Sequence, residues 1–64
     1  MLEKIFAECV VSEKFYYKGN LCMKVMPGQP KLGWFHAYLN MDTYTVYLLD
    51  KVEATSMYVT IKTL

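Results

Sequence analysis

Apolar and polar residues alternate with a period of two over several short stretches of the chain, which predicts β-strands. In residues 21–26 the apolar residues Leu21, Met23 and Val25 occupy the odd positions and give a strand with one apolar side. Residues 57–62 alternate in the same way, and their odd-numbered side chains are expected to face the core. Both stretches therefore predict half-buried strands.

The segment 13–25 predicts a hairpin whose loop length decides which side chains face the core. An odd-length loop, such as residues 17–19 with Gly19 in the left-handed region, places Phe15 on the apolar odd-numbered side. A two-residue turn at Gly19-Asn20 would instead place Phe15 opposite Lys24. We favour the odd loop, which leaves a second face accessible to a ligand or partner; that face carries Lys14, Tyr16, Cys22 and Lys24.

A second hairpin is predicted from strands at 34–39 and 44–49, joined by the turn residues 40–43. The segment 27–33, with two prolines and two glycines, separates this hairpin from the first. The return strand is apolar on both sides, as expected where one side is core and the other an interface. In the first strand Phe35, Ala37 and Leu39 form one face, and Trp34, His36 and Tyr38 form the other, with His36 expected to point away from the core.

The first ten residues fit two patterns. Five apolar residues from Leu2 to Val10 recur at the spacing of one helical face, yet residues 9–11 have the composition of a strand. We expect a short N-terminal helical turn that leads into a strand. Five or so short strands then predict a single all-β domain over residues 1–64, a small antiparallel barrel or twisted sheet of the SH3-like or OB-like kind.

The composition predicts association with a second copy. A chain of 64 residues is near the lower size limit for independent folding, and 55% hydrophobic residues are more than so small a globule hides easily. Cys9 and Cys22 allow one disulfide at most, and both are expected to be buried small hydrophobes. No secretory signal precedes them, so we expect a cytoplasmic protein with reduced thiols that is supplemented by homo-oligomerisation.

The charge is nearly balanced, with seven cations, six acids and a formal net charge of +1. Because all the cations are lysine, the bidentate contacts that arginine makes with guanine or phosphate are missing, which argues against sequence-specific DNA binding. The apolar runs are far shorter than the roughly 20 residues that span a bilayer, so no membrane segment is expected.

The residues with catalytic potential do not form a recognisable set. One histidine and two cysteines are scattered, and the carboxylates sit singly, so neither a nucleophile with its base nor a metal site is predicted. The sequence favours binding over catalysis, with no enzyme activity and no cofactor.

A loose pattern covers about half of the chain. Residues 6–15 follow F-x-x-L-x-x-G-x-x-F, and an aromatic residue, a turn residue and Gly follow at 17–19, before an apolar residue and Lys at 23–24. Ser12 stands where the pattern prefers Gly, and Cys9 where it prefers Leu. This pattern resembles small bacteriophage proteins. The resemblance implies a phage-encoded accessory protein that binds and disables a host component, such as one of bacterial immunity, and it carries over no catalytic residue.

Three modes of binding fit such a protein. A protein that sequesters a nucleotide immune signal needs aromatic faces for the bases and cations or backbone amides for the phosphates, and it can build its pocket between subunits. An inhibitor that blocks a host defence protein needs aromatic anchors on a rigid patch. A small-barrel single-stranded nucleic-acid binder would need a basic groove, which the near-neutral charge disfavours. We favour sequestration, with eight candidate ligand-binding residues: Tyr16, Tyr17, Lys18, Lys24, Lys31, Trp34, His36 and Tyr38.

Overall fold

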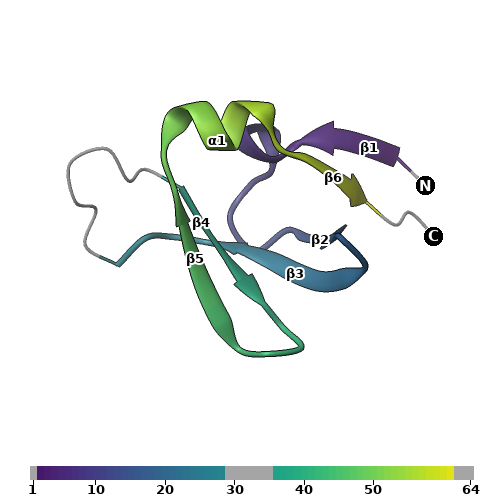
Figure 1. The fold of residues 1–64 in the computed structure, drawn as a ribbon, viewed down its shortest axis with the longest axis vertical. Helices are drawn as coiled ribbons and strands as arrows, with labels where there is room; N and C mark the ends of the chain where they lie inside the picture. The colour runs from purple at the N-terminus through teal and green to yellow at the C-terminus, as the bar shows by residue number, and fades with distance from the viewer. Residues whose placement is uncertain (1, 29–35, 62–64) are drawn as a thin grey trace.

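The structure, a computed structural model, describes residues 2–28 and 36–61 and consists of one antiparallel sheet with a short helix and a 3-10 turn. Its strands run in the order β1-β6-β2-β3-β4-β5, and the sheet does not close into a barrel. Figure 1 shows the strong twist of this sheet, with α1 beside the turn η1 at one end. The predicted twisted antiparallel sheet is therefore confirmed. The elements are β1 (Leu2–Ile5), η1 (Phe6–Glu8), β2 (Lys14–Tyr17), β3 (Asn20–Val25), β4 (His36–Asn40), β5 (Thr45–Leu49), α1 (Lys51–Ser56) and β6 (Tyr58–Ile61).

The hairpin of β2 and β3 turns through two residues, so the predicted odd loop is wrong. Phe15 pairs with Cys22 and Tyr17 with Asn20, which leaves Lys18 and Gly19 as the loop. Both loop residues have positive φ angles, 50° and 81°, as a type I′ turn requires. This even register turns Cys22 and Lys24 toward the inner face of the sheet together with Phe15. The outer face carries Lys14, Tyr16, Leu21, Met23 and Val25.

The core is built around aromatic rings that meet edge to face. The ring centroids of Phe6 lie 5.6 Å from Phe15 and 5.7 Å from Tyr38, and Phe15 lies 5.9 Å from Tyr38. Such pairs add roughly 0.5–1.5 kcal/mol each beyond the area that they bury. Cys9 and Cys22 are free thiols buried in the same cluster, which confirms their predicted role as small hydrophobes.

The N-terminal segment has its strand first and its helical turn second, the reverse of the prediction. Residues 2–5 pair antiparallel with β6, and residues 6–8 form η1. Phe6 N donates to Met57 O at 2.8 Å, which fixes the turn against the start of β6. Residues 9–11 form no strand. The pairing with β6, far away in the sequence, overrides the local helical spacing.

The helix α1 was not predicted. Asp50 caps it: its Oδ1 accepts from Glu53 N at 2.8 Å, while Glu53 Oε1 accepts from Asp50 N at 3.2 Å. These reciprocal bonds form a capping box, and Ala54 is buried against the core. The box fixes α1 directly after β5.

The second hairpin is found where it was predicted, but its turn lies one residue later, at 41–44 instead of 40–43. Asn40 Oδ1 accepts from Asp42 N at 2.9 Å and from Thr43 N at 3.3 Å, and the chain returns through Tyr44 at a φ of 58°. β6 also alternates as predicted, with Val59 buried and Tyr58 exposed. His36, by contrast, faces inward, because its ring centroid lies 6.2 Å from that of Phe6. The predicted positions of Trp34 and Phe35 lie outside the described residues.

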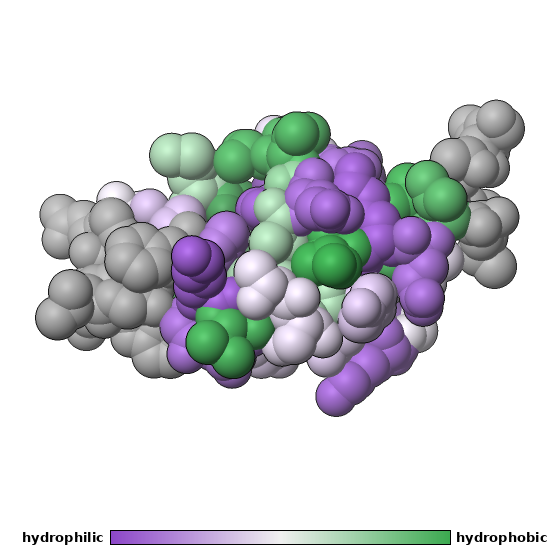
Figure 2. All heavy atoms as spheres, turned by 90° about the horizontal axis from the view of Figure 1, so that it is seen from above, coloured by the Kyte–Doolittle hydropathy of each residue, from purple (hydrophilic) through white to green (hydrophobic). Residues whose placement is uncertain are grey.

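Two further observations concern the surface. The face that carries α1 mixes apolar and polar residues without one continuous apolar patch (Figure 2). Within residues 2–28 and 36–61, no helix has the length and apolar character needed to cross a membrane.

Candidate functional site

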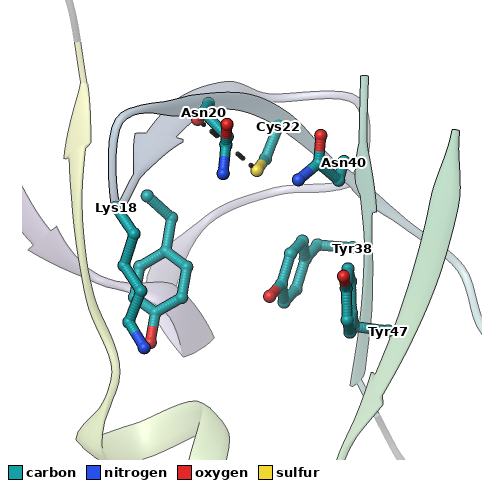
Figure 3. Close-up of a pocket in the computed structure, with 7 residues that line it drawn as sticks. Lys18, Asn20, Cys22, Tyr38, Asn40 and Tyr47 are labelled. Atoms are coloured by element: carbon teal, nitrogen blue, oxygen red, sulfur yellow. Dashed lines mark hydrogen bonds between the residues drawn. The ribbon is translucent and has the colours of Figure 1, made fainter. Parts of the chain in front are cut away.

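Tyrosines from three different strands gather on the inner face of the sheet. Tyr38 of β4 is paired with Tyr47 of β5, and Tyr17 stands at the end of β2 beside the turn residue Lys18. Between them lies a hollow of about 220 Å³, which we call the tyrosine pocket (Figure 3). Its lining consists of Tyr17, Lys18, Asn20, Cys22, Tyr38, Asn40 and Tyr47.

The three rings of the tyrosine pocket pack against one another. Tyr38 and Tyr47 are stacked, with centroids 5.0 Å apart and ring planes at 21°. Tyr17 meets Tyr38 edge to face at 6.1 Å, and Lys18 Nζ lies 5.3 Å from the centroid of Tyr17. Because Tyr38 is held on both sides and Tyr47 remains exposed, the pocket has a fixed inner ring and an accessible outer ring.

Two side-chain amides border the other end of the tyrosine pocket. The oxygen of Asn40 is used by the turn that follows β4, and Figure 3 shows its nitrogen on the side of the pocket. The nitrogen of Asn20 is also directed inward (Figure 3), and Cys22 Sγ donates to the backbone oxygen of Asn20 at 3.6 Å. The pocket thus offers amide donors next to aromatic faces.

Burial keeps two polar groups of the pocket neutral. It raises the pKa of Tyr38 to about 12, with smaller contributions from Cys22 and the neighbouring tyrosines. Burial also raises the pKa of the Cys22 thiol, as does the charge of Asp42 to a smaller extent. At neutral pH Tyr38 is therefore a hydroxyl donor, and Cys22 is a thiol rather than a nucleophilic thiolate.

A second hollow of about 260 Å³ adjoins the tyrosine pocket under α1. Tyr17 and Tyr38 line both hollows, and Glu53 and Ser56 of α1 border the second one. Each hollow alone is smaller than the roughly 300 Å³ at which small-molecule sites usually begin, but the two together exceed it. The combined groove has a lysine at one end and a carboxylate at the other.

A separate cleft of about 500 Å³ lies where β3 ends and β4 begins. We call it the lysine cleft, because Lys24, a residue only 8% exposed, lines it. Lys24 Nζ stands 4.8 Å from the centroid of Phe6, a cation–π contact. Burial lowers the pKa of Lys24, and burial followed by the charge of Lys24 lowers the pKa of His36. The cleft is lined by Val11, Lys24, Val25, Met26, Pro27, Gly28 and His36.

The structure thus divides the candidate ligand-binding residues predicted from the sequence between separate sites. Tyr17, Lys18 and Tyr38 meet in the tyrosine pocket, whereas Lys24 and His36 belong to the lysine cleft. Tyr16 lies on the outer face, paired with Leu21 and Thr60. The predicted positions of Lys31 and Trp34 lie outside the described residues.

Four lining residues of the tyrosine pocket were missed: Asn20, Cys22, Asn40 and Tyr47. Tyr47 was missed because the turn was predicted over residues 40–43, which would set Thr45 opposite Tyr38, whereas the turn over 41–44 sets Tyr47 there. Cys22 was missed because it was predicted to be a buried small hydrophobe, although it stood on the face expected to be accessible to a ligand, and no pattern singled out Asn20. The misjudged loop length of the first hairpin moved the even-numbered residues of β3 from the outer face to the inner face.

Neither a metal site nor a related protein adds to this picture. Among the described residues, His, Cys, Asp and Glu form no group of three or more that could hold a metal ion. No family model, curated protein or solved structure matches the chain. The function is therefore inferred from the chemistry of the site.

Proposed function

We propose that the protein is a non-catalytic binding protein that holds a small nucleotide in the groove formed by the tyrosine pocket and the adjoining hollow. The observation that carries the proposal is the meeting of three tyrosine rings, a lysine and two amides on one concave face. Stacking of a base on an aromatic ring contributes roughly 1–3 kcal/mol and tolerates any base, because every base has a π-face. Tyr47 is the ring that remains accessible for it.

The charges along the groove orient the ligand. Lys18 borders the tyrosine pocket and attracts a phosphate, whereas Glu53 borders the adjoining hollow and repels one. The base end therefore points toward α1, where the Glu53 carboxylate accepts a hydrogen bond from an exocyclic amino group. Asn20 and Asn40 donate to the remaining acceptors of the ligand.

The biological role in this proposal comes from the resemblance to small phage proteins. It makes the ligand a nucleotide signal of bacterial immunity and the protein a sponge that lowers the concentration of free signal in the host cytoplasm. A second copy of the chain closes the pocket from the β5 side, because Tyr47 stands on the edge strand of the sheet. The neutral Tyr38 and Cys22 then bind the signal without cleaving it.

A second candidate function is direct inhibition of a host defence protein. The observation that favours it is the open edge of β5, whose residues Val46 and Leu48 are exposed and apolar. An open edge of this kind accepts a strand from another protein.

Thermal unfolding with a panel of cyclic and linear nucleotides tests the proposal. A ligand at 100 times its Kd adds about 2.7 kcal/mol to the free energy of unfolding, whereas a protein inhibitor shows no shift with any nucleotide. The decisive variant is Lys18→Asn, because Asn-Gly suits a type I′ turn better than Lys-Gly. This variant is expected to be as stable as the wild type or more stable, yet to bind the nucleotide at least tenfold more weakly.

Matched controls separate the pocket from the general surface. Lys14→Ala removes a lysine from the outer face, and Tyr58→Leu removes an exposed ring there; both are expected to leave nucleotide binding unchanged. Tyr47→Leu, in the pocket, is expected to weaken it. Equal losses from Lys14→Ala and Lys18→Asn, or no response to any nucleotide, would refute the proposal.

A further inference from the structure

Lys24 of the lysine cleft is 8% exposed, and its ammonium is not a buried unpaired group, since no fully buried side-chain nitrogen or oxygen of the described residues lacks a hydrogen bond. Glu13 is the acid whose charge acts on Lys24, but its carboxylate is engaged elsewhere, since it accepts from Lys4 Nζ at 3.1 Å and from Val10 N at 3.0 Å. Among the described residues, no hydrogen bond engages Lys24 Nζ. Residues 29–35, which follow the cleft in the sequence, contain no Asp or Glu. Glu13 therefore attracts Lys24 through its charge but makes no hydrogen bond with the ammonium, which stays available to a ligand.

Burying most of a lysine side chain carries a cost, since the desolvation of its charge is repaid only by a well-placed partner. The Phe6 ring, 4.8 Å from Lys24 Nζ, supplies part of the compensation. An apolar side chain of similar length would pack in the same place without that cost. The arrangement is what a site requires when it keeps a cation ready for an anionic ligand.

The volume and the lining of the lysine cleft indicate which kind of ligand it would hold. Its volume of about 500 Å³ falls within the usual range for small-molecule sites, roughly 300–1,000 Å³. Val11, Val25 and Met26 provide apolar walls, while Lys24 and His36 are the side chains with polar hydrogen-bond donors among the described residues that line it. One cation and one imidazole match a single carboxylate better than a dianionic phosphate, and the walls match a hydrocarbon body.

We propose that the lysine cleft binds a small apolar monocarboxylate, with Lys24 pairing with the carboxylate, His36 donating a second hydrogen bond and the apolar walls enclosing the hydrocarbon part. This site is separate from the tyrosine pocket, and the two sites share no lining residue. The proposal does not depend on nucleotide binding.

Titration calorimetry with octanoate and its neutral analogue octanamide tests the charge requirement. Octanoate is expected to bind at least tenfold more tightly than octanamide, because only the carboxylate pairs with Lys24. Lys24→Met keeps the length of the side chain and removes the charge. It is expected to abolish the preference for octanoate and to raise the melting temperature of the free protein, whereas Lys14→Met on the outer face changes neither binding constant.

A second variant tests the proposal independently in case Lys24→Met alters the packing of the core. Met26, which is 71% exposed at the rim of the cleft, tolerates Met26→Glu without repacking. The new carboxylate is expected to weaken octanoate binding at low salt and to leave octanamide binding unchanged. Equal affinities for octanoate and octanamide, or unchanged octanoate binding by both Lys24→Met and Met26→Glu, would overturn the proposal. Lys18→Asn is expected to leave octanoate binding intact, so failure of one site is distinguished from failure of the other.

Discussion

At the scale of single residues, Glu13 connects the turn before β2 with strand β1. Its Oε1 accepts from Val10 N at 3.0 Å, and its Oε2 accepts from Lys4 Nζ at 3.1 Å. The backbone hydrogen bond from Val10, followed by the contacts with Lys4, lowers the pKa of Glu13 below the ordinary value of 4.5, against an opposing effect of burial. Because the folded-state pKa is depressed, the stabilisation is present above 4.5 and is lost as the pH falls through the folded value.

Glu13→Gln is therefore expected to lower the free energy of unfolding by about 1 kcal/mol at neutral pH, the usual net contribution of such a hydrogen bond. The difference from the wild type should shrink to nothing well below pH 4.5, where the wild-type carboxylate is also protonated. Urea unfolding at the two pH values measures it. Glu3→Gln, at an exposed position of β1, serves as the control, and a loss that does not depend on pH would contradict this account.

Among the described residues, three other than glycine have left-handed backbones, and Lys18 among them marks where the prediction of the first hairpin failed. Ser12, Lys18 and Tyr44 have φ angles of 77°, 50° and 58°. The left-handed Gly19 was expected and is found at 81°, but nothing in the sequence indicates that Lys18 joins it. One such residue changes the loop from odd to even and thereby moves all of β3 by one register position. Ser12 also has a positive φ, a conformation that glycine adopts without strain, so a glycine would suit that turn.

At the scale of elements, the capping box of α1 supports one wall of the candidate groove. The helix has only six residues, so most of its stability comes from its cap and from the burial of Ala54. Ala54 N donates to Asp50 O at 3.0 Å, which makes this amide a reporter of the first turn. Glu53 closes the box and also borders the hollow beside the tyrosine pocket. The cap thus links helix stability to the shape of the groove.

Asp50→Ala is expected to lower the free energy of unfolding by about 1 kcal/mol, the usual effect of losing an N-cap. Amide hydrogen exchange should show faster exchange at Glu53 and Ala54, with little change in β2 and β3. Asp42→Ala removes an exposed acid from the turn after β4 and provides the comparison. If Asp42→Ala accelerated exchange in α1 as much as Asp50→Ala, the capping box would not be what holds the first turn.

Part of what determines these helices and strands could be predicted from the sequence. The residues Asp50 and Glu53 have the spacing of a capping box, and this signal was available although six residues are too few to show a helical period. The order of strand and turn at the N-terminus was not available locally. It depends on the pairing of Leu2 with Ile61, across nearly the whole chain. Alternation within a strand is a local property, and for that reason β6 was predicted correctly.

At the scale of the whole molecule, the two edges of the described sheet differ in their chemistry. The edge strand β1 carries the charged residues Glu3 and Lys4, which discourage pairing with another strand. The edge strand β5, TVYLL, contains no charged residue and no proline. On its outer face Val46 and Leu48 are 55% and 45% exposed. One edge is therefore protected, and the other is open.

Apolar residues continue from Val46 and Leu48 across the sheet in two rows, with Ala37 fully buried and the others partly exposed. Val46 lies in register with Leu39 and then Met23, and Leu48 lies in register with Ala37 and then Val25. A second copy that pairs its β5 antiparallel to the first extends both rows through a two-fold axis, because such an interface uses the same patch twice. Such a pairing would also place Tyr47 of each copy beside the axis. We propose that a homodimer through β5 covers the open edge and closes the tyrosine pocket.

We therefore expect light scattering coupled to size-exclusion chromatography to give twice the chain mass of 7.5 kDa for the wild type. Val46→Lys combined with Leu48→Lys places two cations on each copy at the shared edge and is expected to yield monomers that bind nucleotide more weakly. Val52→Lys introduces a cation at an exposed position of α1, away from β5, and should leave the dimer intact. A wild type that stays monomeric with and without nucleotide would refute the dimer. The open edge would then remain for strand addition by a host protein, which is what direct inhibition requires.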